Sequence, residues 1–235
     1  MKHPWRIIES IALPEGRLEL RQRTEGDFLI TLGPTVLMNS LAHRSETALG
    51  MLACEPLRGR KQPRVLVGGL GMGFTLKAVL DALPPEGRVV VAEINPVVLA
   101  WCRGPLASLT AGAADDPRVT VITADVAELI RAAAQEKAGV YDAIVLDLYT
   151  GPHAATDALN DPLYGQGAIE GMRAALAADG VLAVWGESYD AGFDKRLRRA
   201  GFTVSTRRPG RGGLRHIVYV GRLKEYQHNR IRAGH

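Results

Sequence analysis

Three glycines stand at alternate positions, Gly69, Gly71 and Gly73, where the apolar run from 65 to 69 ends. Glycine lets the backbone turn tightly and approach a ligand closely, and the helix expected after this loop would point its N-terminus at the same place. Glu93 follows Gly69 by 24 residues, close to the roughly 20 residues that separate such a loop from a ribose-binding acid. This spacing predicts a nucleoside or nucleotide site. The alternative is that Glu93 is a solvated carboxylate on a loop.

Two aspartates follow the next apolar runs of the same pattern. Asp125 comes after the run 118–124, where it can accept a hydrogen bond from an adenine amino group or cap the following helix, and both roles stay open. Asp147 ends the run 141–147 and can orient or deprotonate an amine or hydroxyl nucleophile. The alternative for Asp147 is an acid bonded to its own loop. The carboxyl ends of parallel strands form one edge of a sheet, so these acids are expected at one site.

Residues after Asp147 are candidates for binding an acceptor molecule. Tyr149 and Thr150 belong to a loop that can form the bottom of the acceptor site. His153 can reach this site, and Tyr164 can cover it. These side chains predict a partly aromatic pocket of modest acidity, which favours a neutral or singly charged acceptor.

Four other residues carry weaker signals. Trp185 lies within an apolar run and is expected in the core, whereas Glu187 at the end of that run is an acid of low specificity. His43 and Glu46 stand at the start of an expected helix; they could meet the site, but we expect both to be exposed on the surface.

The elements that must position these residues follow from apolar runs and turn residues. Short runs at 6–12, 17–22, 28–32 and 35–38 predict a small antiparallel element. A helix is expected at 45–57, with Ser45 as its N-cap. Strands and helices then alternate. The expected strands are 65–69, 88–94, 118–124, 141–147, 180–187, 202–208 and 215–222, and the expected helices are 74–83, 96–109, the stretch ending at 134, 167–178 and 193–200.

The apolar central strands must be covered on both faces, which predicts a parallel sheet with flanking helices. The last two strands are too close in sequence for a crossover, so they are expected to form an antiparallel hairpin. This is an α/β, Rossmann-like architecture of the class I methyltransferase type. We expect a small N-terminal β element at 1–42, the Rossmann-like domain at 43–222 and a polar tail at 223–235.

Composition narrows the class of protein. Hydrophobic residues make up 46% and charged residues 23% of 235, a balance typical of a folded globular chain. The net charge of +4 comes with a basic C-terminal stretch, which we interpret as a solvated face, because no aromatic-rich RNA-binding signature accompanies it. Cys54 and Cys102 match no metal spacing. The sequence lacks an apolar run long enough for a signal peptide or a membrane span, so a cytoplasmic location is expected.

The chain resembles the spermidine synthase (polyamine aminopropyltransferase) family between about 28 and 204. The segments that carry the resemblance are 68–73, 89–98, 115–125, 141–147 and 176–185, and the Asp-Asp-Pro-Arg-Val phrase at 115–119 is the most family-like detail. The resemblance implies that Gly69, Gly71 and Gly73 hold the methionine part of S-adenosylmethionine or of its decarboxylated form. It also implies a homodimer.

The same resemblance implies roles for single residues. Glu93 would bind the ribose, Asp125 the adenine, and Asp147 would be the catalytic aspartate, while Asn39 falls near a cofactor-binding glutamine of the family. There are also departures. The family's glycine loop usually carries an aspartate, whereas this loop has Met72, and the second aspartate of the catalytic loop is replaced by Thr150.

A further departure concerns the tyrosine-histidine-glutamate group that opens the family's preceding helix, because Ala48, Leu49 and Gly50 occupy the corresponding places. These differences favour methyl transfer from S-adenosylmethionine to a small-molecule acceptor. Three alternatives stay open. They are aminopropyl transfer to putrescine from the decarboxylated cofactor, a non-catalytic nucleoside-binding protein, and a nicotinamide dehydrogenase, which the single Rossmann-like unit disfavours.

Overall fold

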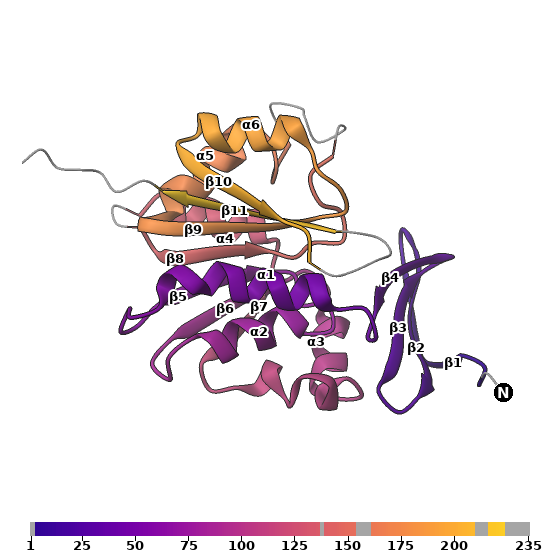
Figure 1. The fold of residues 1–235 in the computed structure, drawn as a ribbon. Helices are drawn as coiled ribbons and strands as arrows, with labels where there is room; N and C mark the ends of the chain where they lie inside the picture. Colours follow the sequence, from indigo (N-terminus) through magenta and orange to yellow (C-terminus); the bar gives the residue numbers. More distant parts are fainter. Residues whose placement is uncertain (1–2, 137–138, 154–160, 210–215, 224–235) are drawn as a thin grey trace, which may run out of the picture.

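The architecture was analysed in a computed structural model, which describes residues 3–136, 139–153, 161–209 and 216–223 (Figure 1). The strands form two separate sheets, one of four strands near the N-terminus and one of seven strands. Helices flank the larger sheet, and the smaller sheet packs at one end of it. The expected α/β class with a separate N-terminal β element is confirmed. The expected tail from 224 onward lies outside the described residues.

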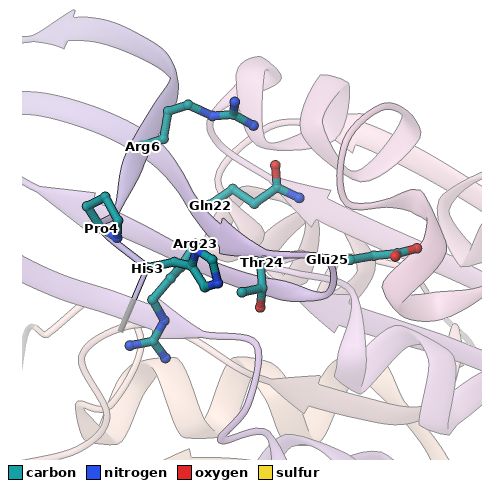
Figure 2. A pocket seen from close by; sticks show the side chains of 7 residues that line it. All are labelled: His3, Pro4, Arg6, Gln22, Arg23, Thr24 and Glu25. Atoms are coloured by element: carbon teal, nitrogen blue, oxygen red, sulfur yellow. The ribbon is translucent and has the colours of Figure 1, made fainter. Parts of the chain in front are cut away.

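The N-terminal sheet is a simple antiparallel meander. Its strands are β1 (Arg6–Leu13), β2 (Gly16–Thr24), β3 (Asp27–Leu32) and β4 (Thr35–Asn39). Alternate residues of β2 and β3, such as Leu20 and Ile30, are buried in the core that this sheet shares with the helices of the larger one. A shallow cavity of about 390 Å³ lies on this sheet (Figure 2), lined by polar and charged residues from 3–6 and 22–25.

The seven-stranded sheet has the order β10-β11-β9-β8-β5-β6-β7. Its strands are β5 (Arg64–Gly68), β6 (Arg88–Glu93), β7 (Val119–Thr123), β8 (Tyr141–Leu146), β9 (Leu176–Gly186), β10 (Phe202–Arg207) and β11 (Ile217–Leu223). Strands β5 to β9 pair in parallel, whereas β11 pairs antiparallel to both β9 and β10. The predicted parallel sheet with a terminal antiparallel hairpin is therefore confirmed.

Helices cover both faces of this sheet. They are α1 (Arg44–Cys54), α2 (Phe74–Ala82), α3 (Pro96–Arg103), α4 (Val126–Ala134), α5 (Gln166–Ala175) and α6 (Ala191–Arg199). Successive residues of a strand point to opposite faces. Val65 and Val67 of β5 pack in the core with α1, α2 and α3, whereas Leu66 packs with α4, α5 and α6. Double-sided burial explains why these strands are continuous apolar runs.

Some expected helix boundaries were wrong. Helix α1 begins at Arg44, and Ser45 is not its N-cap; His43 takes that position without a side-chain bond. The helix ends at Cys54, followed by a 3-10 turn over Glu55–Leu57 that contains a proline. Proline cannot donate a backbone hydrogen bond to the preceding helical turn.

Two other helices are shorter than expected. Helix α3 ends at Arg103, because a glycine and Pro105 follow it, and the rest of the expected helix contains the 3-10 turn Ala107–Thr110. Helix α5 ends at Ala175 rather than at 178, because β9 already begins at Leu176, opposite Tyr141 of β8.

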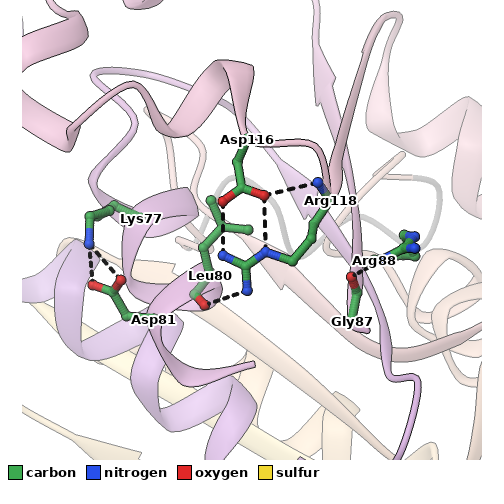
Figure 3. Close-up of polar contacts among 7 residues, drawn as sticks. All are labelled: Lys77, Leu80, Asp81, Gly87, Arg88, Asp116 and Arg118. Carbon is green, nitrogen blue, oxygen red and sulfur yellow. Dashed lines mark hydrogen bonds and ion pairs between the residues drawn. The ribbon is translucent and has the colours of Figure 1, made fainter. Parts of the chain in front are cut away.

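The family-like phrase before β7 serves as a structural connection (Figure 3). Both carboxylate oxygens of Asp116 accept hydrogen bonds from the guanidinium of Arg118, at 2.9 and 3.0 Å. The same guanidinium donates to the carbonyl of Leu80 near the end of α2, at 3.0 Å. The Arg118 charge and its hydrogen bonds hold the pKa of Asp116 below its ordinary value. This arrangement attaches the start of β7 to α2.

None of the helices in the described part of the chain combines the length and the apolar character that crossing a bilayer requires.

Candidate functional site

A cavity of about 460 Å³ opens where the two sheets meet. It lies at the carboxyl ends of β5, β8 and β9, and strand β4 and the first turn of α1 complete its wall. Its lining consists of Thr35–Asn39, Ala42, Glu46, Leu70, Gly71, Met72, Phe74, Asp147, Leu148, Tyr149, Trp185, Glu187 and His216. The structure thus brings residues from five separate parts of the sequence to one place.

The glycine loop after β5 has the conformation that only glycine adopts easily. Gly69, Gly71 and Gly73 have φ angles of +88°, +54° and +84°. A Cβ atom on Gly69 would collide with the carbonyl oxygen of Asp147, and one on Gly71 would lie 2.8 Å from the sulfur of Met38. Of the three glycines, Gly71 is the one found in the cavity lining. Gly69 has a different effect, because it brings the loop against the end of β8.

Glu93 ends β6 and is buried, with 8% of its surface exposed. Its Oε2 accepts the backbone N–H of Leu70 at 2.9 Å, and its Oε1 accepts that of Asn95 at 2.8 Å. A carboxylate oxygen can accept about two hydrogen bonds, so each oxygen retains acceptor capacity. Glu93 therefore both supports the glycine loop and can still accept bonds from a ligand.

Asp125 follows β7 and caps α4, since its Oδ1 accepts the backbone N–H of Ala127 at 2.9 Å. This observation confirms the capping role, and the adenine-binding role stays a prediction. Two apolar side chains near Glu93 and Asp125 were not singled out from the sequence. Ile94 is 73% exposed and Ile122 38% exposed. Exposed isoleucines beside two acids at one sheet edge would suit a flat aromatic base.

Asp147 follows β8 and lines the cavity. Its Oδ2 lies 2.6 Å from the hydroxyl of Thr75, which is also 3.1 Å from the backbone carbonyl of Glu46. Burial raises the pKa of Asp147 to about 7, and the charge of Glu46 adds to the rise, whereas the Thr75 hydrogen bond opposes it. The Thr75 hydroxyl has one proton for two acceptors. A protonated Asp147 would let both hydrogen bonds form, because it could donate to Thr75.

Glu46 and Trp185 do not lie where the sequence analysis expected. Glu46 was expected on the surface, but it lines the cavity and is half-buried. Trp185 was expected in the core; it packs against the core and also lines the cavity, with its ring 4.8 Å from that of His216. His43 was also expected to be exposed, and it is instead half-buried against the ring of Phe74 at 4.0 Å. These contacts could not be predicted from the sequence, because those of His43 and Glu46 depend on how α1 packs and that of Trp185 depends on how β9 pairs with β11.

Of the candidate acceptor residues, Tyr149 lies in the described cavity lining, whereas Tyr164, Thr150 and His153 do not. Tyr149 lines the cavity and is 48% exposed. Tyr164 is buried in the core, where its hydroxyl donates to the backbone carbonyl of Thr150 at 3.0 Å, so it supports the loop from beneath. Thr150 and His153 are exposed and do not belong to the described lining. Asn39 lines the opposite wall.

Comparison with known sequences identifies relatives of more than one activity, among them methyltransferases and aminopropyltransferases. The family model of the spermine/spermidine synthase domain matches residues 49–191. Putrescine N-methyltransferase 4 of Nicotiana tabacum is 34% identical over 139 residues, which cover 59% of this chain and 33% of that protein. Polyamine aminopropyltransferase 1 of Hyperthermus butylicus is 36% identical over 119 residues, covering 51% of this chain and 39% of that protein. The chain thus spans about a third of the length of these relatives.

Solved structures show the same fold. Spermidine synthase from Thermotoga maritima matches with a TM-score of 0.72 at 21% identity, over 92% of this chain and 72% of that one. Human methyltransferase-like protein 13, solved in complex with SAH, matches with a TM-score of 0.55 at 23% identity, over 78% of this chain and 82% of that one.

Proposed function

The chain belongs to the spermine/spermidine synthase family, and from this premise we propose that it transfers a methyl group from S-adenosylmethionine to a small amine. The observation that carries this proposal is the lining of the cavity. Carboxylates of Glu46, Asp147 and Glu187 and the aromatic rings of Tyr149 and Trp185 share one space. Carboxylates and aromatic faces both attract an ammonium group. The cavity is therefore more acidic than the sequence analysis expected, and this difference narrows the acceptor from a neutral or singly charged molecule to an amine.

The residues at the carboxyl edge of the main sheet fit the cofactor. Glu93 retains acceptor capacity on both oxygens for the ribose hydroxyls, and Asp125 and the exposed Ile94 lie where an adenine could be bound. Leu70 and Gly71 of the glycine loop face the cavity and would approach the methionine part. When bound, the cofactor would supply a methyl carbon activated by a positively charged sulfur.

The glycine loop favours S-adenosylmethionine over its decarboxylated form. The decarboxylated cofactor ends in an ammonium group without a carboxylate, and an acid in the loop would bind it. Here Leu70, Gly71 and Met72 line the cavity and carry no charge. The N-terminus of α2 begins directly after Gly73, and a helix N-terminus favours a carboxylate.

Asp147 would align the acceptor. Its carboxylate can accept a hydrogen bond from the reacting amine, and the Thr75 hydroxyl at 2.6 Å fixes its orientation. An approaching ammonium group favours the charged form of Asp147, so binding of the amine and ionisation of this acid support each other. Leu148 and Met38 exclude water from the wall nearby. Fixed geometry and exclusion of water contribute most of the acceleration in such transfers.

The experiment is calorimetry with S-adenosylmethionine, its decarboxylated form and methylthioadenosine, followed by mass spectrometry of products from a panel of monoamines and diamines. We expect tighter binding of S-adenosylmethionine and the addition of one methyl group to an amine. Glu93→Ala should weaken the binding of all three ligands. Asp147→Asn should bind them normally and transfer about 100-fold more slowly. Asp81→Asn, in an exposed pair on α2, is the matched control.

Other results would change the conclusion. Preference for the decarboxylated cofactor, with an aminopropyl group found on the product, would establish the alternative activity that the aminopropyltransferase relatives carry. Binding of nucleosides without turnover of any amine would support a non-catalytic role instead.

A further inference from the structure

His216 is a cavity residue to which neither the sequence analysis nor the proposed function has assigned a role. It stands immediately before β11 and lines the cavity. Its Nδ1 lies 3.0 Å from the hydroxyl of Ser45, 171 residues away in the first turn of α1. That hydroxyl donates to Oε2 of Glu46 at 2.6 Å. Ser45 is buried, with 5% of its surface exposed, whereas Glu46 and His216 are half-buried at the cavity.

The order of protons along this chain follows from the chemistry of the groups. An ionised carboxylate only accepts hydrogen bonds, so the single proton of the Ser45 hydroxyl points to Glu46. The Ser45 oxygen can then only accept from Nδ1 of His216. A neutral ring that carries its proton on Nδ1 has its lone pair on Nε2. The arrangement therefore defines one tautomer and leaves Nε2 as a base.

The charged groups around the ring are acids. Glu46 of α1, Asp147 after β8 and Glu187 after β9 are the acids of the cavity, and none of its described lining residues is lysine or arginine. The indole ring of Trp185, with its centroid 4.8 Å away, adds a π face. An imidazolium at this place would donate through Nδ1 toward Ser45 and Glu46, and its charge would be balanced by them.

We propose that His216, held by Ser45 and Glu46, accepts the proton that the acceptor amine must lose before it can react as a nucleophile. The inference rests on the proposed function, because it needs an amine acceptor. In this step the N–H bond of the protonated amine breaks and its electron pair stays on nitrogen. The proton bonds to Nε2, so a neutral ring becomes imidazolium as a cationic amine becomes neutral. The proton later passes to solvent.

This assignment divides the work between His216 and Asp147. The charge of Asp147 attracts and orients the amine, and that charge would vanish if Asp147 also took the proton. His216 starts neutral, so accepting a proton leaves the acids of the cavity ionised. Asp147 is then a residue that binds the amine, His216 is the base, and Ser45 is a positioning residue that acts through His216.

A spectroscopic experiment tests the arrangement without any turnover. Nitrogen-15 spectra of the labelled full chain should show the neutral ring of His216 as the Nδ1–H tautomer. Ser45→Ala, which keeps a small side chain at a buried position, should shift the ring toward the Nε2–H tautomer common in free histidine. Ser108→Ala, at an exposed position, is the matched control and should change nothing. A wild-type ring found as the Nε2–H tautomer would overturn the proposal.

Kinetics then test the function of the base. Asparagine can imitate Nδ1 as a donor to Ser45 but has no basic nitrogen, so His216→Asn should lower kcat for an alkylamine about 100-fold. We expect KM to change little, because Asp147 still binds the amine. An aromatic amine, which is neutral at the assay pH, should be methylated at similar rates by the variant and the wild type. His3→Asn, at an exposed histidine of the N-terminal sheet (Figure 2), is the control.

The two levels of failure can be told apart. Equal slowing of both amines in His216→Asn would mean that His216 shapes the site rather than accepts a proton, which would overturn the inference alone. A wild-type chain that methylates no amine would overturn the proposed function and the role of His216 together. Melting temperatures of the variants identify any loss of activity that comes from unfolding.

Discussion

Carboxylates in this molecule behave according to what the fold places beside them. Glu93 is buried, but two backbone N–H groups satisfy its charge. Asp116 faces a guanidinium, which lowers its pKa. Asp147 has one hydroxyl and a neighbouring acid, so burial prevails and its pKa rises to about 7. The sequence placed Glu93 and Asp147 at strand ends, where a site was expected. Their different environments could not be predicted, because Leu70 reaches Glu93, and Thr75 and Glu46 reach Asp147, through tertiary packing.

The raised pKa of Asp147 predicts a pH-dependent stability. Its pKa in the fold, about 7, exceeds the ordinary 3.8, so the folded state binds the proton more tightly than the unfolded chain does. This contribution to stability is complete below the ordinary pKa and is lost as the pH rises through about 7. Asp147→Asn cannot ionise and should be more stable than the wild type near pH 8, by at most about 4 kcal/mol. Urea titrations at about pH 4.5 and about pH 8 measure the difference. A constant difference between the two pH values would contradict the prediction.

At the scale of elements, the sequence predicted strands better than helix ends. Apolar runs bounded by turns predicted all eleven strands of the described chain, and the central strands of the larger sheet gave the strongest signal because both of their faces are buried. The predicted N-cap of α1 was wrong, because Ser45 is of a residue type that caps helices but its hydroxyl bonds to Glu46 and His216 instead. The family resemblance described Gly50 only as one of three residues that replace the family's tyrosine-histidine-glutamate group. The structure gives that glycine a packing role.

Gly50 permits the close crossing of α1 and α2. A Cβ atom there would lie 2.8 Å from the Cβ of Ala78 and 2.8 Å from the carbonyl oxygen of Thr75. Gly50→Ala should therefore lower the free energy of unfolding by about 2–3 kcal/mol through overpacking. Gly171→Ala in α5 is the matched control, because a Cβ there meets nothing within 4 Å. That variant should gain about 0.5–1 kcal/mol from higher helix propensity. Thermal denaturation of both variants tests this prediction, and equal shifts of their melting temperatures would refute the packing argument.

The connection between β7 and α2 can be tested in the same way. Arg118 makes hydrogen bonds to Asp116 and to Leu80, whereas Lys77 pairs with Asp81 on an exposed helix surface (Figure 3). Arg118→Met should cost about 1.5–3 kcal/mol, because it leaves a partly buried carboxylate and a carbonyl without their donor. Lys77→Met removes an exposed ion pair and should cost less than about 0.5 kcal/mol. Similar losses in the two variants would mean that the family-like phrase has no special structural role.

At the scale of the whole molecule, the cavity exists because two sheets meet. Strand β4 supplies five consecutive lining residues, and the methionine at 38 lies against Gly71 of the other sheet. No pattern in the sequence announces this junction, because its partners are distant in the chain. One junction contact is polar. The indole Nε1 of Trp101 in α3 donates to the carboxylate of Glu9 in β1 at 2.7 Å, across 92 residues.

The contact between Trp101 and Glu9 should hold the N-terminal sheet in place. Trp101 is 1% exposed, so Glu9→Ala leaves its buried N–H donor without the acceptor and does not alter the buried ring. We expect a loss of about 1–2 kcal/mol and faster amide exchange in β1, while β5 exchanges as before. Glu15→Ala, at an exposed position in the turn after β1, is the matched control. If β1 and β5 exchange faster by the same factor, the hydrogen bond stabilises the whole fold rather than the junction. The cavity wall that β4 forms would then not depend on this hydrogen bond in particular.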